Sequence, residues 1–161
     1  MALDYVFRPM TTTDLPLLRH WLAQPHVRQW WGDPSEQDDL VSGDLNEPAM
    51  DQFIVSVGGS DFAYLQCYEL SAWNSGFGEH PEGTLGIDQF IGEPDMVERG
   101  HGSAFVRAFV DDCFRQGAPR VVTDPDPANA RAVRAYQKAG FEKAGMVETP
   151  DGPALLMVRN A

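Results

Sequence analysis

Residues 99–103 read Arg-Gly-His-Gly-Ser, and an apolar stripe follows them directly. Its apolar residues recur at four-residue spacing in two rows, namely Phe105, Phe109 and Cys113, and Val106, Val110 and Phe114. This spacing predicts a helix that begins after Gly102. Glycines before a helix let the backbone approach a ligand and point its N–H groups at it, and the helix N-terminus adds partial positive charge. The stretch therefore predicts a pyrophosphate site between a strand and a helix.

The glycine spacing by itself does not identify the ligand, since many loops contain Gly-x-Gly. The Lys and Ser/Thr of a P-loop are missing at the required offset. The loop also opens no early βαβ unit of the kind that binds dinucleotides.

A second informative segment runs from Asp124 to Phe141. Asp126 followed by Pro127 predicts the start of a helix, with Asp126 as its N-cap. This helix is expected to continue to about Ala139, with Gly140 in the left-handed position beyond its end. Asn129 and Tyr136 lie seven residues apart, which is two helical turns, so they share a face. An amide there suits an extended ligand and a phenol suits proton donation; alternatively, Tyr136 is a half-buried packing residue.

The remaining pattern indicates a mixed α/β (α+β) domain with a single sheet. We expect strands at Tyr5–Arg8, Gln52–Val57, Phe62–Leu70, Thr84–Ile91, Arg120–Thr123, Phe141–Glu148 and Ala154–Arg159. We expect helices at Leu15–Leu22, ended by Pro25, and at Ser35–Leu45, a turn at Trp30–Pro34, and a loop at Ala72–Gly83. One domain over residues 1–161 follows from this length.

Charge is distributed unevenly along the chain. The formal net charge is -12, from 24 acidic and 12 basic residues. No lysine or arginine lies between Arg28 and Arg99, whereas acidic residues recur throughout that stretch. This acidity argues against nucleic acid as a partner and favours a cationic ligand. The alternative for most of these acids is that they keep the chain in solution.

Other features bound the location. No apolar run approaches the roughly 18 residues of a membrane span, and the first residues lack a signal-peptide layout, so we expect a cytoplasmic protein without membrane partners. Cys67 and Cys113 show no CxxC spacing and are interpreted as buried, reduced residues. The four histidines show no metal-ligand spacing, so no metal is expected.

Both motifs, in this order and spacing, resemble the GNAT superfamily of acetyltransferases. The family's pyrophosphate loop reads roughly (Gln/Arg)-x-x-Gly-x-(Gly/Ala), and Val97 departs from it at the first position. The family's Asn…Tyr…Gly-Phe segment is matched by Asn129, Tyr136, Gly140 and Phe141. The resemblance implies a GNAT fold, with a single central, mixed, mostly antiparallel sheet flanked by helices, and acetyl-CoA as co-substrate.

Several stretches are similar to the aminoglycoside 6′-N-acetyltransferases within this superfamily. They are Trp21–Val27 with Trp30–Gly32, Gly86–Gln89, Thr123–Ala132, Tyr136–Phe141 and Thr149–Ala154. Some of these pieces, notably Pro-His-Val and Trp-Trp, also occur in siderophore-type lysine acyltransferases. The Ile-Asp-Gln and Thr-Pro-Asp-Gly-Pro pieces point to the aminoglycoside group.

The resemblance implies a role for each matched residue. The cofactor-binding set is Phe90, Ile91, Glu98, Arg99, Gly100, His101, Gly102, Ser103, Asn129, Ala132 and Tyr136. The substrate-binding set is Trp30, Trp31, Tyr64, Asp88, Asp124 and Asp151. Tyr68, Trp73 and Phe77 are further candidates for the substrate side.

The resemblance also implies which residues transfer protons and which stabilise charge during the reaction. Tyr136 protonates the leaving thiolate, and a backbone N–H near Phe90 and Ile91 stabilises the oxyanion. Asp88 is the candidate base; because a free aspartate has a pKa of about 3.9, its role in binding the amine is the stronger expectation. One of Trp30 and Trp31 packs on a sugar ring and the other lies in the core.

Three functions remain open at this point. The first is direct acetyl transfer, through a ternary complex, to the 6′-amine of an aminoglycoside. The second is transfer to another amine, such as a siderophore lysine or hydroxylysine, a polyamine or a protein N-terminus. The third is a coenzyme A-binding domain without catalysis. A monomer and a homodimer are both compatible with the sequence.

Overall fold

The computed structural model describes residues 3–73 and 76–161; within the expected loop Ala72–Gly83, residues 74 and 75 lie outside the described residues. The described helices are α1 Leu15–Leu22, α2 Pro25–Trp31, α3 Pro34–Gly43, α4 His101–Arg115 and α5 Ala130–Lys138. The strands are β1 Tyr5–Pro9, β2 Met50–Val57, β3 Ser60–Glu69, β4 Leu85–Ile91, β5 Arg120–Thr123, β6 Glu142–Thr149 and β7 Gly152–Asn160. Short 3₁₀ turns occur at η1 Thr12–Asp14, η2 Asp44–Asn46, η3 Leu70–Ala72 and η4 Pro94–Met96.

The described strands form one seven-stranded sheet in the order β1-β2-β3-β4-β5-β7-β6. Strand β1 pairs antiparallel with β2, and β7 pairs antiparallel with both β5 and β6. Strands β4 and β5 are parallel. The expected mixed α/β class with a single sheet is confirmed, and the seven strands lie close to the expected ranges.

The chain divides into two compact units, each described here by itself. Unit 1 comprises Met1–Gln66 and Gln89–Arg99, and unit 2 comprises Cys67–Asp88 and Gly100–Ala161. Strands β3 and β4 therefore contribute residues to both units.

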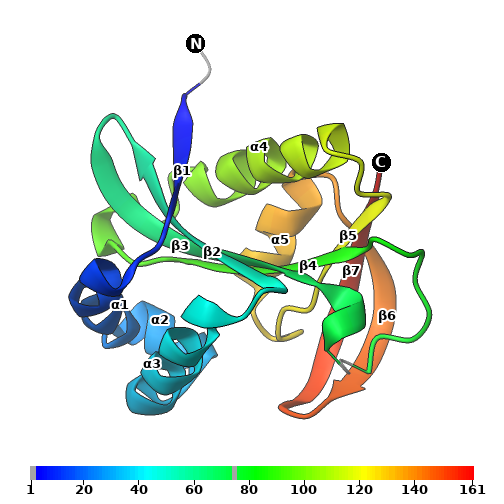
Figure 1. The fold of residues 1–161 in the computed structure, drawn as a ribbon, viewed down its shortest axis with the longest axis horizontal. Helices are drawn as coiled ribbons and strands as arrows, with labels where there is room; N and C mark the ends of the chain where they lie inside the picture. Colours follow the sequence, from blue (N-terminus) through cyan, green and yellow to red (C-terminus); the bar gives the residue numbers. More distant parts are fainter. Residues whose placement is uncertain (1–2, 74–75) are drawn as a thin grey trace. The chain divides into compact units, whose positions relative to one another are not determined.

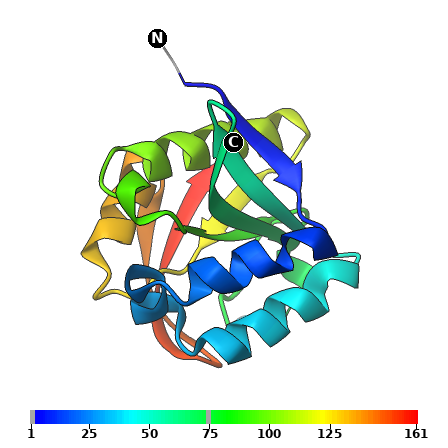
Figure 2. The same ribbon diagram turned by 90° about the vertical axis from the view of Figure 1, so that its left-hand side faces the viewer.

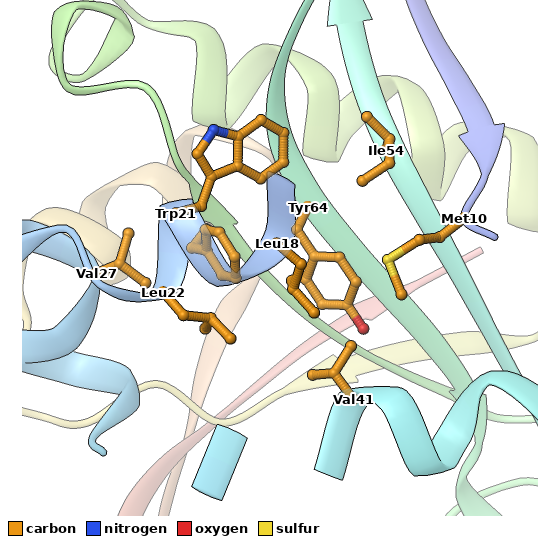
Figure 3. Close-up of a cluster of buried hydrophobic side chains, with 9 residues drawn as sticks. Met10, Leu18, Trp21, Leu22, Val27, Val41, Ile54 and Tyr64 are labelled. Carbon is orange, nitrogen blue, oxygen red and sulfur yellow. The ribbon is translucent and has the colours of Figure 1, made fainter. Parts of the chain in front are cut away.

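Unit 1 is built around the apolar face of α1, which lies beside α3 (Figure 2). Leu18, Trp21 and Leu22 are buried in a cluster that also contains Tyr64 (Figure 3). A Cβ built on Gly92 would lie 2.1 Å from Cγ of Trp21, so the indole packs directly on the backbone after β4. The indole N–H donates to Oε1 of Glu93 at 3.0 Å. The predicted helical stripe is therefore confirmed as a core face.

The expected turn at Trp30–Pro34 is wrong in its first half. Pro25 does not merely end the preceding helix; it begins α2, whose last residues are Trp30 and Trp31. Proline suits the first position of a helix because its missing N–H would have no partner there. The turn falls instead on Gly32, and Asp33 then caps α3 by accepting from the N–H of Glu36 at 3.0 Å.

Unit 2 contains α4, α5 and the strands β5, β7 and β6, which lie side by side (Figure 1). Phe105, Val106, Val110 and Cys113 form the buried face of α4, as the four-residue spacing predicts. Both cysteines are free and buried. The described residues contain no helix long and apolar enough to cross a membrane.

The predicted start of α5 is also wrong. The helix begins at Ala130, and its N-cap is Asn129, whose side-chain oxygen accepts from the N–H of Ala132 at 3.2 Å. Asp126 instead closes the preceding turn by accepting from the N–H of Ala128 at 2.9 Å. Aspartate and asparagine are both good N-caps, so the local sequence is compatible with a helix start after Asp126 or after Asn129. The helix starts after Asn129. The helix ends as predicted, with Gly140 at φ +98°.

Candidate active site

The N-terminus of α4 has the backbone expected of an anion site. Gly100 is its N-cap at φ 82°, no side chain caps the first turn, and a Cβ on Gly100 would meet no atom within 4 Å. Glu98 is also left-handed, at φ 64°. Alternating left-handed residues before a helix turn successive N–H groups outward, and the 15-residue helix adds its dipole. The donor set therefore fits a diphosphate.

The side chains of this loop are arranged around that backbone. Glu98, Arg99 and Gly100 are exposed, and His101, Gly102 and Ser103 are half-buried. The hydroxyl of Ser103 donates to the carbonyl oxygen of Gly100 at 3.2 Å, which closes the first turn. The hydroxyl of Ser103 is therefore used within the turn, and the backbone N–H groups are the donors that this helix end offers.

Two carboxyl groups meet at the ends of the parallel strands β4 and β5. Gly86 pairs with Val122, and the hydroxyl of Thr123 donates to the carbonyl oxygen of Ile87 at 3.0 Å. The next residues in this register are Asp88 and Asp124, whose side chains hydrogen-bond to each other. The carboxyl ends of parallel strands are where open α/β sheets bind ligands.

This pair is electrostatically unusual. Partial burial, followed by the charge and hydrogen bond of Asp88 and the charge of Asp151, raises the pKa of Asp124 to about 8. Two adjacent carboxyl groups resist losing both protons, so they titrate as a unit. Near neutral pH the pair consequently retains one proton that a bound cation can displace.

Asp151 approaches this pair from the β6–β7 turn. The hydroxyl of Thr149 accepts from the N–H of Asp151 at 3.2 Å and donates to the carbonyl oxygen of Gly152 at 2.8 Å. The N–H of Leu155 donates to the carbonyl oxygen of Pro125 at 3.0 Å, which ties β7 to the segment after Asp124. Asp151 is exposed, and its charge acts on Asp124, so the three carboxyl groups form one acidic cluster within unit 2.

Tyr136 and Asn129 belong to α5 in different ways. Tyr136 is 4% exposed, and its ring meets that of Phe141 edge to face at 5.6 Å. Asn129 uses its amide oxygen for the N-cap bond with Ala132, so its amide nitrogen is the group not used in that bond. Ala132 is half-buried, and its N–H already donates to the side chain of Asn129. Its methyl group is therefore the part of Ala132 that could contact a ligand.

Unit 1 contains the aromatic members of the expected site. Trp31 meets Phe90 at 5.0 Å and Tyr64 at 6.1 Å, both edge to face, and Tyr64 is fully buried. Trp30, by contrast, is 37% exposed at the end of α2. The ring of Phe90 is part of the core, so its contribution to a reaction centre is confined to its backbone.

The end of β4 is fixed by backbone hydrogen bonds. A ring nitrogen of His26, Nε2, donates to the carbonyl oxygen of Ile91 at 2.8 Å. The N–H of Gly92 donates to the carbonyl oxygen of Phe62 at 2.8 Å. This hydrogen bond fixes the ring of His26 against the end of β4.

Described residues of η3 and of the segment before β4 line an open pocket in unit 2. The pocket has a volume of about 650 Å³, and its lining includes Trp73, Phe77, Glu79 and Glu82. His80 anchors this segment, because its Nε2–H donates to the carbonyl oxygen of Phe77 at 2.9 Å and its Nδ1 accepts from Arg120 at 3.1 Å. No group of three or more potential metal ligands occurs in residues 3–73 and 76–161.

Sequence reasoning gave little weight to Tyr68 and Gly86. A Cβ on Gly86 would lie 2.3 Å from Cζ of Tyr68, so the phenol rests on the backbone of β4 beside the acidic cluster. The available signal was the glycine itself, because glycine inside a strand often marks the close approach of another group.

The fold and these sites place the chain in a known family. Residues 10–149 match the acetyltransferase (GNAT) domain model. The chain belongs to this family and is an acetyltransferase.

Individual relatives narrow the comparison. The chain is 35% identical to aminoglycoside N(6′)-acetyltransferase type 1 of Klebsiella pneumoniae, over 94% of this chain and 81% of that protein. A solved structure of the aminoglycoside acetyltransferase AAC(6′)-Ib with coenzyme A and kanamycin matches with a TM-score of 0.88 at 34% identity, covering 98% of this chain and 95% of that one. A more distant relative, N-hydroxyputrescine acetyltransferase of Acinetobacter baumannii, is 27% identical over 89% of this chain and 71% of that protein.

Proposed function

We propose that this chain transfers the acetyl group of acetyl-CoA directly to the 6′-amine of an aminoglycoside, within a ternary complex. The observation that carries the proposal is the acidic cluster of Asp88, Asp124 and Asp151, which suits a ligand bearing several ammonium groups. The similarity to aminoglycoside 6′-acetyltransferases along nearly the whole chain supports the same acceptor.

The co-substrate would be bound through its phosphates and its extended arm. The N–H groups at the start of α4, within Glu98–Ser103, would bind the pyrophosphate. The amide nitrogen of Asn129 and the methyl group of Ala132 would contact the pantetheine arm. The co-substrate supplies the thioester carbonyl that the amine attacks.

The carboxyl pair would bind the acceptor and remove its proton. An ammonium that binds beside Asp88 and Asp124 favours their fully ionised form, because opposite charges stabilise each other, and the pair releases its proton to solvent. That ionised pair then accepts a proton from the ammonium and returns to its singly protonated state. A carboxyl pKa of about 8 suits this exchange near neutral pH. Asp88 thus acts as part of a pair, both as amine ligand and as proton acceptor.

The remaining roles concern the leaving group, the oxyanion and the sugar. Tyr136 would donate its phenol proton to the departing thiolate, and a backbone N–H at Phe90 or Ile91 would stabilise the oxyanion. The exposed Trp30 is the better placed of the two tryptophans for packing on a sugar ring. Trp31 and Tyr64 would support that contact from the core cluster.

A second acceptor class is favoured by one observation. The relative named N-hydroxyputrescine acetyltransferase suggests an acceptor derived from a linear polyamine, which the same acidic cluster would suit. The two proposals differ in whether the acceptor is an aminosugar. Cytoplasmic location, a single domain and a monomeric or homodimeric state remain predictions.

An acceptor panel tests the proposal. Purified protein and acetyl-CoA are incubated with kanamycin, tobramycin, spermidine or hydroxylysine, and thiol release is followed. We expect turnover with the aminoglycosides, with the acetyl group located at the 6′-nitrogen by NMR of the product. Turnover with spermidine but with neither aminoglycoside would overturn the proposal in favour of the second acceptor class.

The acidic cluster has a matched control. Asp88→Asn is expected to raise the KM for kanamycin at least tenfold, because a charge-assisted hydrogen bond contributes roughly 1.5–3 kcal/mol. Asp126→Asn removes the same charge from an exposed turn residue and is expected to leave that KM within twofold. An equal KM in both variants would remove Asp88 from the amine site.

A further inference from the structure

Tyr68 lies unusually close to the backbone of β4. A Cβ built on Gly86 would be 2.3 Å from Cζ, 2.5 Å from Cε2 and 2.6 Å from the hydroxyl oxygen of Tyr68. A real Cβ cannot approach that closely, so the phenol end of the ring occupies the space that any other residue at position 86 would fill. The ring is buried, and its hydroxyl end rests on β4.

The same face of β4 presents Asp88. Side chains two residues apart on a strand point to the same side of the sheet, so Asp88 lies on the face of β4 that the phenol of Tyr68 covers at Gly86. The parallel register with β5 then places Asp124 beside Asp88. Burial, followed by the charges of Asp88 and Asp124, raises the pKa of Tyr68, so the phenol stays protonated and keeps a proton to donate.

A second contact holds the ring in place. The indole of Trp73 meets the ring of Tyr68 at 5.5 Å with an interplanar angle of 60°. Trp73 also lines the pocket between η3 and β4. The backbone of Gly86 and the indole of Trp73 together restrain the orientation of the phenol.

We propose that Tyr68 is a positioning residue whose hydroxyl donates to the Asp88–Asp124 pair and orients these carboxyl groups toward the acceptor amine. This inference deepens the proposed function and rests on it for the identity of the acceptor. The hydrogen bond to the carboxyl pair does not depend on which amine is acetylated.

Tyr68→Phe isolates the hydroxyl, because it keeps the ring on Gly86. A hydrogen bond to a carboxylate stabilises its ionised form, so losing that bond raises the pKa of the pair. We expect the acidic limb of the pH profile for kcat/KM with kanamycin, where the pair must lose its proton, to move up by about one pH unit. We expect KM to rise by about tenfold or more and acetyl-CoA affinity to remain within twofold.

A ligand-free readout separates this inference from the acceptor assignment. ¹³C NMR follows the titration of labelled aspartate carboxyl groups, with signals assigned from Asp88→Asn and Asp124→Asn. The other ionisable groups that act on Tyr68 are Tyr136 and Cys67, and Asp151 acts on Asp124 as a further carboxylate. Its signal is assigned from Asp151→Asn.

Two further variants complete the test. Tyr5→Phe removes a phenol from β1 in unit 1 and is expected to leave the carboxyl titration unchanged. Gly86→Ala pushes the ring of Tyr68 away and should reproduce the upward shift, even if it lowers stability. An upward shift in Tyr68→Phe supports the assignment even if no aminoglycoside is acetylated. Titration curves identical to wild type in both Tyr68→Phe and Gly86→Ala would overturn it, whichever amine is the acceptor.

Discussion

At the scale of single residues, Asp124 combines the two conditions that raise a carboxyl pKa, partial burial and a neighbouring carboxyl group. Neither condition is visible in its immediate sequence, Thr-Asp-Pro, which reads as an ordinary turn. The consequences concern both stability and catalysis.

Asp124 is expected to make the fold less stable as pH rises. Its pKa of about 8 in the folded chain lies above the value of about 3.9 for an unfolded chain, so the folded state binds the proton more tightly. That stabilisation is fully present below about pH 4 and is lost as pH rises toward 8. Asn mimics the protonated carboxyl, so Asp124→Asn should be more stable than wild type at pH 9 and similar to it at pH 4. Urea unfolding at pH 4, 7 and 9 measures this difference, with Asp126→Asn as control. A constant difference between Asp124→Asn and wild type would contradict the prediction.

Tyr136→Phe is expected to lower kcat by about 100-fold, because general acid catalysis contributes roughly that factor or more. The ring contact with Phe141 is retained in this variant, so the dissociation constant of coenzyme A should stay within twofold. Steady-state kinetics and calorimetry provide the two values. Loss of coenzyme binding with an intact kcat would show Tyr136 to be a packing residue.

At the scale of elements, helices α4 and α5 of unit 2 differ at their N-termini. The α4 N-terminus presents its N–H groups without a side-chain cap, whereas the α5 N-terminus is capped by Asn129. Asn129 therefore caps α5 through its side-chain oxygen. We propose that its amide nitrogen also binds the ligand.

The two roles of Asn129 can be separated by substitution. Asn129→Asp keeps a capping oxygen and removes the amide donor, so unfolding should be unchanged while coenzyme A binds about tenfold more weakly. Asn129→Ala removes both and should also lower the free energy of unfolding by about 1 kcal/mol. Chemical unfolding and calorimetry on both variants provide the comparison. Equal coenzyme affinity in Asn129→Asp and wild type would leave capping as the role of Asn129.

At the scale of the whole molecule, the net charge of -12 is expected to affect the binding of the two substrates in opposite directions. A polycationic acceptor is attracted to the chain, whereas the phosphates of acetyl-CoA are repelled by it, and salt screens both effects. We expect kcat/KM for kanamycin to fall several-fold between about 20 and 300 mM salt, where the screening length falls below about 10 Å. The KM for acetyl-CoA should fall or stay constant over the same range. Parallel losses for both substrates would indicate a general effect of salt on the enzyme instead.

The success of sequence-based prediction depended on how local each feature is. The strands, the α4 stripe and the glycine after α5 follow from spacings of two to four residues, and they were predicted. The starts of α2 and α5 were misplaced because Pro25 and Asp126 each fit two local structures, and packing selects between them. The roles assigned to Trp30, Asn129 and Asp151 remain predictions.

By itself, the sequence determined the seven strands, the helices other than α2, the core faces of α1 and α4, and the glycine turn that opens α4. Only the tertiary structure decided that Asp88 stands beside Asp124 and that Tyr68 rests on Gly86. The physical reason is that an alternating pattern specifies the face of a strand on which a side chain lies, but neither its neighbouring strand nor the register between them. The parallel pairing of β4 with β5 supplies that information. It brings two carboxyl groups together so that one of them keeps its proton near neutral pH.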